Sequence, residues 1–325
     1  MRPFHHRPNM LRPSTVLAAS FVAAACASQT PLTPAPVPDG PRGHLMIVGG
    51  GPRPAAMREE FVRLAGGPAS ARIVVLPMAS ANAERAGESE VNALRRLGVE
   101  ARSLILTREQ AMNPATARQF DGVTGIWFPG GVQTRLTTIL RGTPVEAAIR
   151  ERYHAGAIVG GTSAGAAIMT SPMITGGERR PGGARPLSES SRDAFVTIDR
   201  ANVETEPGLT LLPGAIVDQH FVRRRRHNRL ISLVLENPSL VGAGIDESTA
   251  LLVSPDGLWR VIGESVVIVY DARDAEVTQP ADPVVGAAGM RMHVLPPGSV
   301  FDPRTGRAIL EEALGAERQL EPTLP

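Results

Sequence analysis

One serine stands in a segment where almost every neighbour has a very small side chain. Residues 157–169 read AIVGGTSAGAAIM, with Ser163 inside Gly-Thr-Ser-Ala-Gly. A Gly-x-Ser-x-Gly segment between a strand and a helix is typical of a nucleophile elbow, a sharp turn that exposes the serine hydroxyl. Only small neighbours fit such a turn, which accounts for Gly161, Ala164 and Gly165. The competing interpretation is a tight turn that needs glycine for its backbone alone.

A serine nucleophile needs a base, and a histidine base is usually oriented by a carboxylate. Among the seven histidines, His220 is the best placed, because it follows the apolar stretch LTLLPGAIV and so stands at a predicted strand end. Glu247 follows another apolar, glycine-rich run and is the first candidate for the acid. Glu178 is the alternative, since it lies nearer to Ser163 in the sequence. Asp218 is a third candidate, but its position beside His220 favours contact with a substrate.

Four consecutive arginines, Arg223 to Arg226, follow the candidate base, and Arg229 comes soon after them. Such a run can bind nucleic acid, but no aromatic residues are interleaved with it and the formal net charge is only +2. We therefore expect no nucleic-acid partner. Arginines beside a catalytic histidine would instead select the carboxylates of a substrate through charge-assisted hydrogen bonds. Arg224 and Arg226 cannot share one helix face, so only part of the run can point into a site.

The elements around these residues predict an α/β fold. Apolar runs that read as buried strands cover residues 44–51, 71–80, 100–106, 125–131 and 157–161. Helical spacing of apolar residues occurs over residues 54–66 and 83–98. This alternation indicates a mostly parallel sheet flanked by helices, in which ligands bind at the carboxyl ends of the strands. Residues 249–272 contain a Pro-Asp-Gly turn between valine-rich runs, which predicts antiparallel strands near the C-terminus.

The composition divides the chain into three parts. Residues 1–27 begin with positive charges and continue into a short apolar run, as a signal peptide does. Residues 28–43 are rich in proline and predict an extended tether. Residues 44–325 are predicted to form a single domain, since 42% hydrophobic and 20% charged residues are typical of globular proteins. The chain has no lysine, so no lysine base or Schiff base is available.

Cys26, the only cysteine, ends the apolar run of the predicted signal peptide. Ala25-Cys26-Ala27 fits a cleavage site, whereas residues 23–26 resemble a lipobox in which Cys26 is lipidated. We expect an exported protein, either periplasmic, an outer-membrane lipoprotein or extracellular, that touches a membrane only through a lipid at Cys26. The mature domain can form no disulfide of its own. No spacing of His, Cys and Asp resembles a metal site, and no cofactor is expected.

Three segments, GGTSAGAAIM, DQHFVRRRRHNRL and GIDESTALLV, closely resemble motifs of cyanophycinase and its relatives in the S51 serine peptidase family, which includes aspartyl dipeptidase. FPGGVQTRL is similar to the Gly-Gly-x-Gln segment of that family, although Val132 stands where we expect an acidic residue. The similarity covers residues 44–271. It implies a class I glutamine amidotransferase-like, flavodoxin-like fold with serine in place of the catalytic cysteine. A glutaminase itself is a poor fit, because Cys26 lies outside the domain.

The resemblance also implies roles for individual residues. It implies a catalytic triad of Ser163, His220 and Glu247, with an oxyanion hole formed by the N–H groups of Ala164 and Gly131. It further implies a pocket that binds the β-Asp-Arg unit, formed by Gln133, Asp218, Gln219, Arg224, Arg226 and Arg229. In that pocket Asp218 would suit the arginine side chain of the substrate, and the arginines would suit its free carboxylates.

The activity implied by the resemblance is that of an exported serine peptidase. It would hydrolyse β-aspartyl linkages of cyanophycin, multi-L-arginyl-poly-L-aspartate, to β-Asp-Arg dipeptides. Two alternatives stay open. One is an aspartyl dipeptidase-like exopeptidase acting on other Asp or isoAsp peptides, and the other is a non-catalytic binding lipoprotein. Because some relatives dimerise, a homodimer is a further expectation.

Overall fold

The computed structural model describes residues 40–178, 197–279 and 283–310, which all belong to one compact unit. The predicted signal peptide, the lipidation site at Cys26 and the tether up to residue 39 lie outside the described residues, so they stay predictions. Among the helices of the described ranges, none has both the length and the apolar character needed to cross a membrane.

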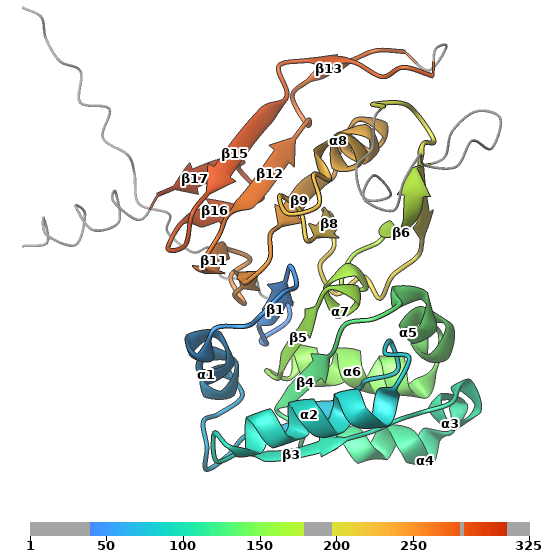
Figure 1. Cartoon of the computed structure of the whole chain (residues 1–325), viewed down its shortest axis with the longest axis vertical. Helices are drawn as coiled ribbons and strands as arrows, with labels where there is room; N and C mark the ends of the chain where they lie inside the picture. The colour runs from blue at the N-terminus through green and yellow to red at the C-terminus, as the bar shows by residue number, and fades with distance from the viewer. Residues whose placement is uncertain (1–39, 179–196, 280–282, 311–325) are drawn as a thin grey trace, which may run out of the picture. The chain divides into compact units, whose positions relative to one another are not determined.

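Nine strands form a mixed sheet (Figure 1). Its parallel strands are β1 (Leu45–Val48), β2 (Arg72–Val75), β3 (Glu100–Ser103), β4 (Gly125–Phe128) and β5 (Ile158–Thr162). Its antiparallel strands are β10 (Thr249–Val253), β11 (Trp259–Gly263), β16 (Val300–Asp302) and β17 (Arg307–Ile309). The order across the sheet is β17-β16-β11-β10-β1-β5-β4-β2-β3. The predicted α/β fold, with parallel strands and antiparallel C-terminal strands, is confirmed.

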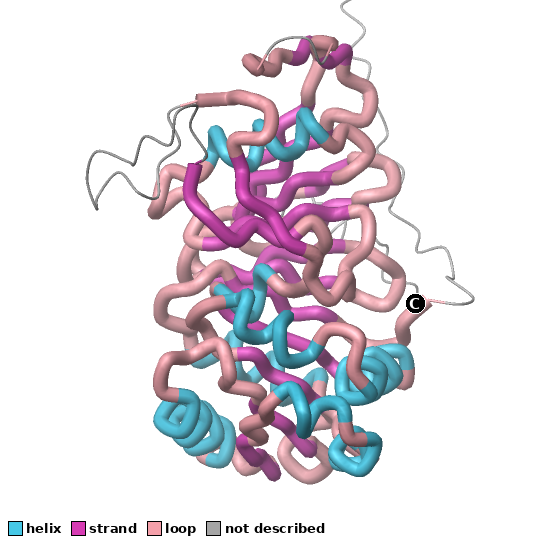
Figure 2. Tube along the Cα trace, turned by 90° about the vertical axis from the view of Figure 1, so that its right-hand side faces the viewer, coloured by secondary structure: helices cyan, strands magenta, loops and turns pink. Residues whose placement is uncertain are grey.

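Helices cover both faces of the parallel strands, as the cyan segments on either side of the magenta strands show in Figure 2. On one face lie α1 (Ala55–Leu64) and α2 (Ala83–Arg95), where Phe61 and Leu94 pack against Ile73 and Trp127. The other face carries α3 (Arg108–Met112), α4 (Pro114–Ala117), η1 (Arg118–Phe120), α5 (Gln133–Leu140), α6 (Pro144–His154) and α7 (Ala164–Ala167). Burial on both faces explains why the central strands β1 and β4 carry no polar side chain, whereas β3 at the edge of the sheet carries Glu100 and Arg102.

A second, four-stranded sheet carries two of the candidate catalytic residues at its strand ends. Its strands are β8 (Ala215–Gln219), β9 (Val241–Ile245), β12 (Val267–Asp271) and β15 (Arg291–Leu295), in the order β15-β12-β9-β8. Strands β8 and β9 are parallel, so their carboxyl ends meet at one edge. Helix α8 (His227–Glu236) packs on this sheet. Two short pairs complete the described strands, β6 (Met173–Glu178) with β7 (Val203–Glu206) and β13 (Glu276–Val277) with β14 (Ala287–Ala288).

Candidate active site

Ser163 occupies the turn between β5 and α7. Its backbone has φ 54° and ψ −110°, and a residue other than glycine rarely adopts positive φ without support from its surroundings. The support comes from β1, whose Val48 carbonyl accepts a hydrogen bond of 3.0 Å from the Ser163 N–H. Gly165 is required by close approach, because a Cβ there would lie 2.1 Å from the Phe128 carbonyl oxygen. The turn therefore has the sharp geometry that its small residues predict.

The imidazole of His220 lies between the serine hydroxyl and a carboxylate. Its Nε2 is 2.9 Å from Oγ of Ser163, and its Nδ1 is 2.6 Å from Oε1 of Glu247. A carboxylate at Nδ1 holds the tautomer in which Nε2 can accept the proton of the serine. Of the three candidate acids, Glu247 makes this contact. Asp218 pairs with Arg229 instead, and the side chain of Glu178 lies outside the described residues. The structure thus brings the three predicted residues together.

The glycine turn that follows β1 supports the imidazole from the other sheet. The Gly49 carbonyl accepts a hydrogen bond of 2.7 Å from the backbone N–H of His220. The Gly50 carbonyl accepts one of 2.9 Å from the backbone N–H of Ser248. Gly50 has φ 121°, and a Cβ there would lie 2.2 Å from Cε1 of His220. The turn therefore fits against the histidine only because it has no side chain at this position.

A second glycine turn, after β4, lies on the side of the serine hydroxyl. A Cβ on Gly130 would lie 3.4 Å from Cβ and 3.9 Å from Oγ of Ser163. The turn is held by a hydrogen bond of 2.9 Å from the Val132 N–H to the Ala79 carbonyl. The two predicted oxyanion donors, the N–H groups of Gly131 and Ala164, thus belong to the two turns that flank the hydroxyl. Their role in stabilising an oxyanion stays a prediction.

The surroundings of His220 favour its neutral form. Burial is the largest cause that lowers the pKa of its imidazole below the ordinary value. The hydrogen bond that the imidazole donates to Glu247 opposes this effect, and the positive charges of Arg224 and Arg226 reinforce it. With a pKa below its usual range, the imidazole is neutral at pH 7, which is the form that a general base requires.

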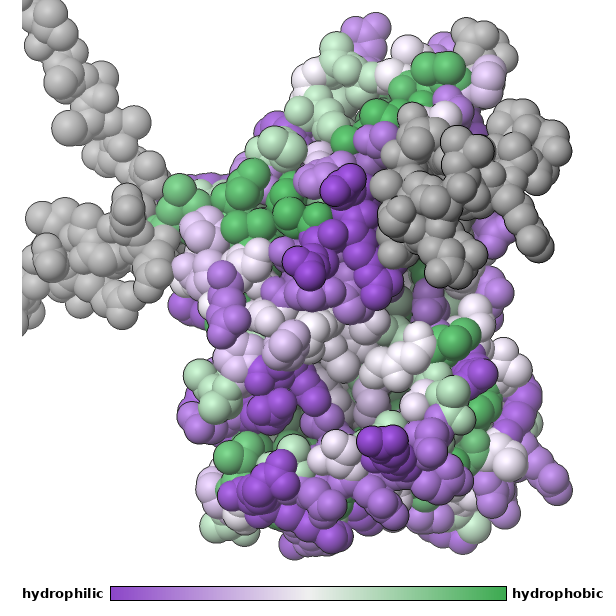
Figure 3. Space-filling model, viewed as in Figure 1, coloured by the Kyte–Doolittle hydropathy of each residue, from purple (hydrophilic) through white to green (hydrophobic). Residues whose placement is uncertain are grey.

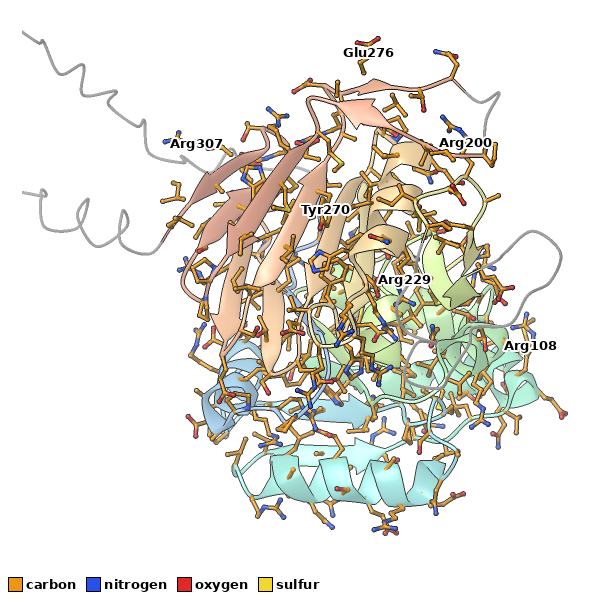
Figure 4. All side chains as sticks on the ribbon, turned by 45° about the horizontal axis from the view of Figure 1, so that its top comes forward. Arg108, Arg200, Arg229, Tyr270, Glu276 and Arg307 are labelled. Atoms are coloured by element: carbon orange, nitrogen blue, oxygen red, sulfur yellow. The ribbon has the colours of Figure 1, made fainter. Side chains whose placement is uncertain are left out.

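Three predicted pocket residues form a buried ionic cluster. The carboxylate of Asp218 is fully buried and is held by both ends of the Arg229 guanidinium, with 2.6 Å between Nε and Oδ2. Arg226 lies 3.7 Å from the same carboxylate and donates to the backbone and side-chain oxygens of Gln219. Arg229, labelled in Figure 4, projects from α8. Since the Asp218 carboxylate faces arginines of its own chain, its position favours a supporting role over contact with a substrate guanidinium.

Two predicted pocket residues keep partial contact with solvent, namely Gln133 and Arg224. Gln133 begins α5, and its side-chain amide donates a hydrogen bond of 2.8 Å to the Ile174 carbonyl of β6. The Arg224 N–H donates to the His220 carbonyl at 2.9 Å, so this arginine belongs to the same loop as the candidate base. Gln219, by contrast, is buried.

Sequence reasoning missed the role of Asp246, which stands beside Glu247. One of its carboxylate oxygens accepts the Arg223 N–H at 2.9 Å, and the other accepts the Ser265 hydroxyl at 2.8 Å. Asp246 therefore ties the loop that carries His220 to the end of β9. The pair of neighbouring acids in GIDES was the available signal.

In the described ranges no group of three or more His, Cys, Asp or Glu side chains is placed to hold a metal ion.

Comparisons with known proteins identify the family and the fold of the chain. The sequence profile of peptidase family S51 matches residues 45–261. A cyanophycinase of Trichormus variabilis is 33% identical over 275 residues, which cover 81% of this chain and 87% of the relative. A cyanophycinase of Synechococcus elongatus is 33% identical over 276 residues, covering 82% and 81%. A solved peptidase from an acI-B1 Actinobacterium has the same fold, with a TM-score of 0.55 at 23% identity over 79% of this chain and 98% of that one.

Proposed function

The chain belongs to peptidase family S51, a family of serine-type peptidases, and we propose that it degrades cyanophycin to β-Asp-Arg dipeptides. The observation that carries this proposal is the line of contacts from Ser163 through His220 to Glu247 in a chain similar to cyanophycinases. Arginine stays attached to the side-chain carboxyl in a β-Asp-Arg product. The bonds that are cut are therefore the main-chain amides that join successive β-Asp-Arg units. They are not the β-aspartyl linkages expected from the resemblance, because hydrolysis of those would release free arginine.

In the first half of the proposed reaction, Oγ of Ser163 attacks the carbonyl carbon of the scissile bond. Nε2 of His220 takes the hydroxyl proton, while Glu247 stabilises the imidazolium through Nδ1–H. The negative charge that develops on the carbonyl oxygen accepts hydrogen bonds from the N–H groups of Ala164 and Gly131. The tetrahedral intermediate collapses to an acyl-enzyme when His220 returns its proton to the leaving amine.

In the second half, water replaces the departed amine. His220 removes a proton from that water, which attacks the ester carbonyl of the acyl-enzyme. Collapse of the second tetrahedral intermediate releases the new carboxylate and returns the proton to Oγ of Ser163. The neutral imidazole that the lowered pKa of His220 ensures at pH 7 is needed at the start of both halves.

Substrate selection is proposed to rest on the arginines of the loop after β8. Each unit of cyanophycin carries a free arginine carboxylate as well as a guanidinium. Arg224, which is half-buried next to His220, is suited to bind that carboxylate by charge-assisted hydrogen bonds. The buried pair of Asp218 and Arg229 then supports the loop from within.

The function is tested by mass spectrometry of the soluble products after the purified domain is mixed with insoluble cyanophycin. We expect β-Asp-Arg from the wild type and from Ser70→Ala, a surface serine control, but none from Ser163→Ala. Hydrolysis of short peptides with N-terminal Asp, without attack on the polymer, would replace the proposal by a dipeptidase-like activity. A folded wild type that cleaves neither would overturn it in favour of a binding protein.

Export, a lipid at Cys26 and a homodimer stay predictions that accompany this function. The first two are tested by isolating the protein from its native host and determining its N-terminus and mass. The homodimer is supported by strand β15 at the edge of its sheet, where Met292 and Val294 are 57% and 50% exposed. Figure 3 shows hydrophobic side chains gathered over this part of the molecule. A single monomeric mass in analytical ultracentrifugation would contradict the homodimer.

A further inference from the structure

An ion pair anchors the chain just after the glycine turn that follows β1. Arg53 follows this turn by two residues and forms two parallel hydrogen bonds with Glu90 of α2, at 2.9 and 2.6 Å. The side chains of Arg53 and Glu90 are only 15% and 8% exposed. A planar guanidinium in a two-point bond with a carboxylate fixes orientation as well as distance.

The guanidinium of Arg53 is also held by a contact between its planar face and an aromatic ring. Cζ of Arg53 lies 4.9 Å from the centre of the Trp127 ring of β4. Trp127 is itself buried and makes an edge contact with Phe61 of α1, with 5.1 Å between the ring centres. The end of the turn is therefore held by α2 through an ion pair and by the sheet through a cation–π contact.

Ser248, next to Glu247, holds the other side of the same turn. Its N–H donates to the Gly50 carbonyl at 2.9 Å, and its hydroxyl donates to the Pro52 carbonyl at 2.8 Å. Between these two attachments the turn packs closely against His220 and Glu247. A Cβ on Gly51 would lie 2.9 Å from Cβ of Glu247, and Gly50 lies against the imidazole of His220.

We propose that Arg53 and Glu90 are positioning residues. By fixing the glycine turn, they hold the side chains of His220 and Glu247 at their hydrogen-bonding distance. This inference rests on the proposed function, since it assigns the pair a task in that reaction. Stability alone does not explain the pair, because apolar residues of similar volume often replace a buried ion pair without loss of stability. An apolar pair cannot fix the direction of the turn as the two-point bond does.

The test compares Glu90→Gln and Arg53→Lys with Glu60→Gln, which breaks the surface pair of Glu60 and Arg63. In the first two variants we expect kcat on cyanophycin to fall about tenfold or more, since small misplacements of catalytic groups have effects of this size. We expect KM to change little. The thermal midpoint should fall, because loss of one partner leaves a buried charge uncompensated, so kcat is compared at a temperature where both variants are folded. The acid limb of the pH profile should move to lower pH, because a displaced Glu247 no longer raises the pKa of His220. Glu60→Gln should match the wild type.

The low-field NMR signal of the Nδ1 proton between His220 and Glu247 provides a readout that needs no substrate. We expect this signal to shift or broaden in Glu90→Gln and Arg53→Lys, even if the wild type does not cleave cyanophycin. An inert wild type with a normal signal would therefore overturn the proposed function and not this inference. If both variants fold and keep the kcat, the pH profile and the NMR signal of the wild type, the inference is wrong. The double variant Arg53→Met/Glu90→Met should fold and stay slow; recovery of full kcat would also contradict the inference.

Discussion

At the scale of single residues, the reactivity of Ser163 depends on how its neighbour His220 is oriented. Glu247 holds Nδ1 at 2.6 Å and leaves Nε2 free to face the serine at 2.9 Å. A neutral amide in place of the carboxylate favours the wrong tautomer and cannot stabilise the imidazolium. We predict that Glu247→Gln lowers kcat by about 10³- to 10⁴-fold.

The matched control for this prediction is Glu178→Gln, which alters the alternative acid. Steady-state kinetics on cyanophycin should show a far smaller effect for Glu178→Gln than for Glu247→Gln. If the two effects were reversed, Glu178 would be the residue that orients the histidine.

The pH dependence of the reaction follows from the charges around His220. Its pKa is lowered from the ordinary 6.5 by burial, with Arg224 among the groups that lower it. A base with a lowered pKa becomes neutral at lower pH, so kcat/KM should rise with pH through a midpoint below 6.5. Removing a positive charge raises the pKa, and Arg224→Gln should therefore move this limb to higher pH.

The control is the exposed neighbour Arg225, whose substitution by glutamine should leave the limb in place. The measurement is kcat/KM as a function of pH for the three proteins. A limb that stays in place in Arg224→Gln would show that this charge does not act on His220, and a limb that moves to lower pH would contradict the expected sign.

Some residue roles could be predicted from the sequence and others could not. Ser163 was identifiable because the demands of its turn are local and are written in the five residues around it. Asp218 was assigned to the substrate because nothing in the sequence indicates that Arg229, eleven positions away, turns its guanidinium onto that carboxylate. That contact depends on how α8 packs on the second sheet, which is a tertiary property.

At the scale of elements, the site is built at the carboxyl ends of strands from two sheets. The turns after β5, β4 and β1 contribute Ser163, Gly131 and Gly50. Strands β8 and β9 are followed directly by His220 and Asp246. In the parallel register of β8 and β9, Gln219 is the partner of Ile245, so the next residues of both strands leave the sheet side by side. This pairing explains why residues far apart in the sequence meet.

The turn after β1 is the element most sensitive to a small change. Gly50→Ala would place a methyl group 2.2 Å from Cε1 of His220. We predict a loss of at least about tenfold in kcat, because the imidazole must move away from Ser163. Gly156→Ala is the control, since Gly156 has a similar φ of 114° but no atom within 4 Å of a new Cβ. Equal losses in kcat for both variants would mean that backbone strain alone, and not the contact with His220, causes the effect.

The parallel strands of the large sheet were predictable, because most of them lie in runs that are apolar on both faces and have few alternatives to a central strand. The short strands β16 and β17 of the same sheet were not predicted. The hairpin of β10 and β11 was predictable from its Pro-Asp-Gly turn, and the two strands do pair antiparallel. The separation of β8, β9, β12 and β15 into a sheet of their own was not predicted. Their sequences resemble those of the other strands, and pairing partners are decided by tertiary packing.

At the scale of the whole molecule, an ionic network centred on Asp271 joins the second sheet to the C-terminal strands. Its carboxylate is fully buried and accepts hydrogen bonds from Arg273 and Arg291, and Arg273 also donates to the Pro303 carbonyl. The hydrogen bonds from Arg273 are the largest cause that lowers the pKa of Asp271 to about 2. A carboxyl with a lowered pKa adds stability above its unfolded pKa and loses it as the pH falls towards the folded value.

We predict that Asp271→Asn lowers the free energy of unfolding by about 2 kcal/mol at pH 7. The difference from the wild type should shrink as the pH falls from about 4 towards 2. Urea unfolding across this range measures it. Asp274→Asn, which removes the exposed partner of Arg291, should change little. A difference for Asp271→Asn that does not depend on pH would contradict the electrostatic explanation.

Ser163 and His220 follow strands of different sheets. The serine can therefore be activated as a nucleophile only if the two sheets pack so that these two side chains meet. The most direct measurement is to treat the purified domain with a fluorophosphonate, digest it and locate the adduct by mass spectrometry. We predict a single phosphonyl group on Ser163, together with loss of both labelling and cyanophycin cleavage in Ser163→Ala. An adduct on another residue, or cleavage that persists in Ser163→Ala, would contradict it.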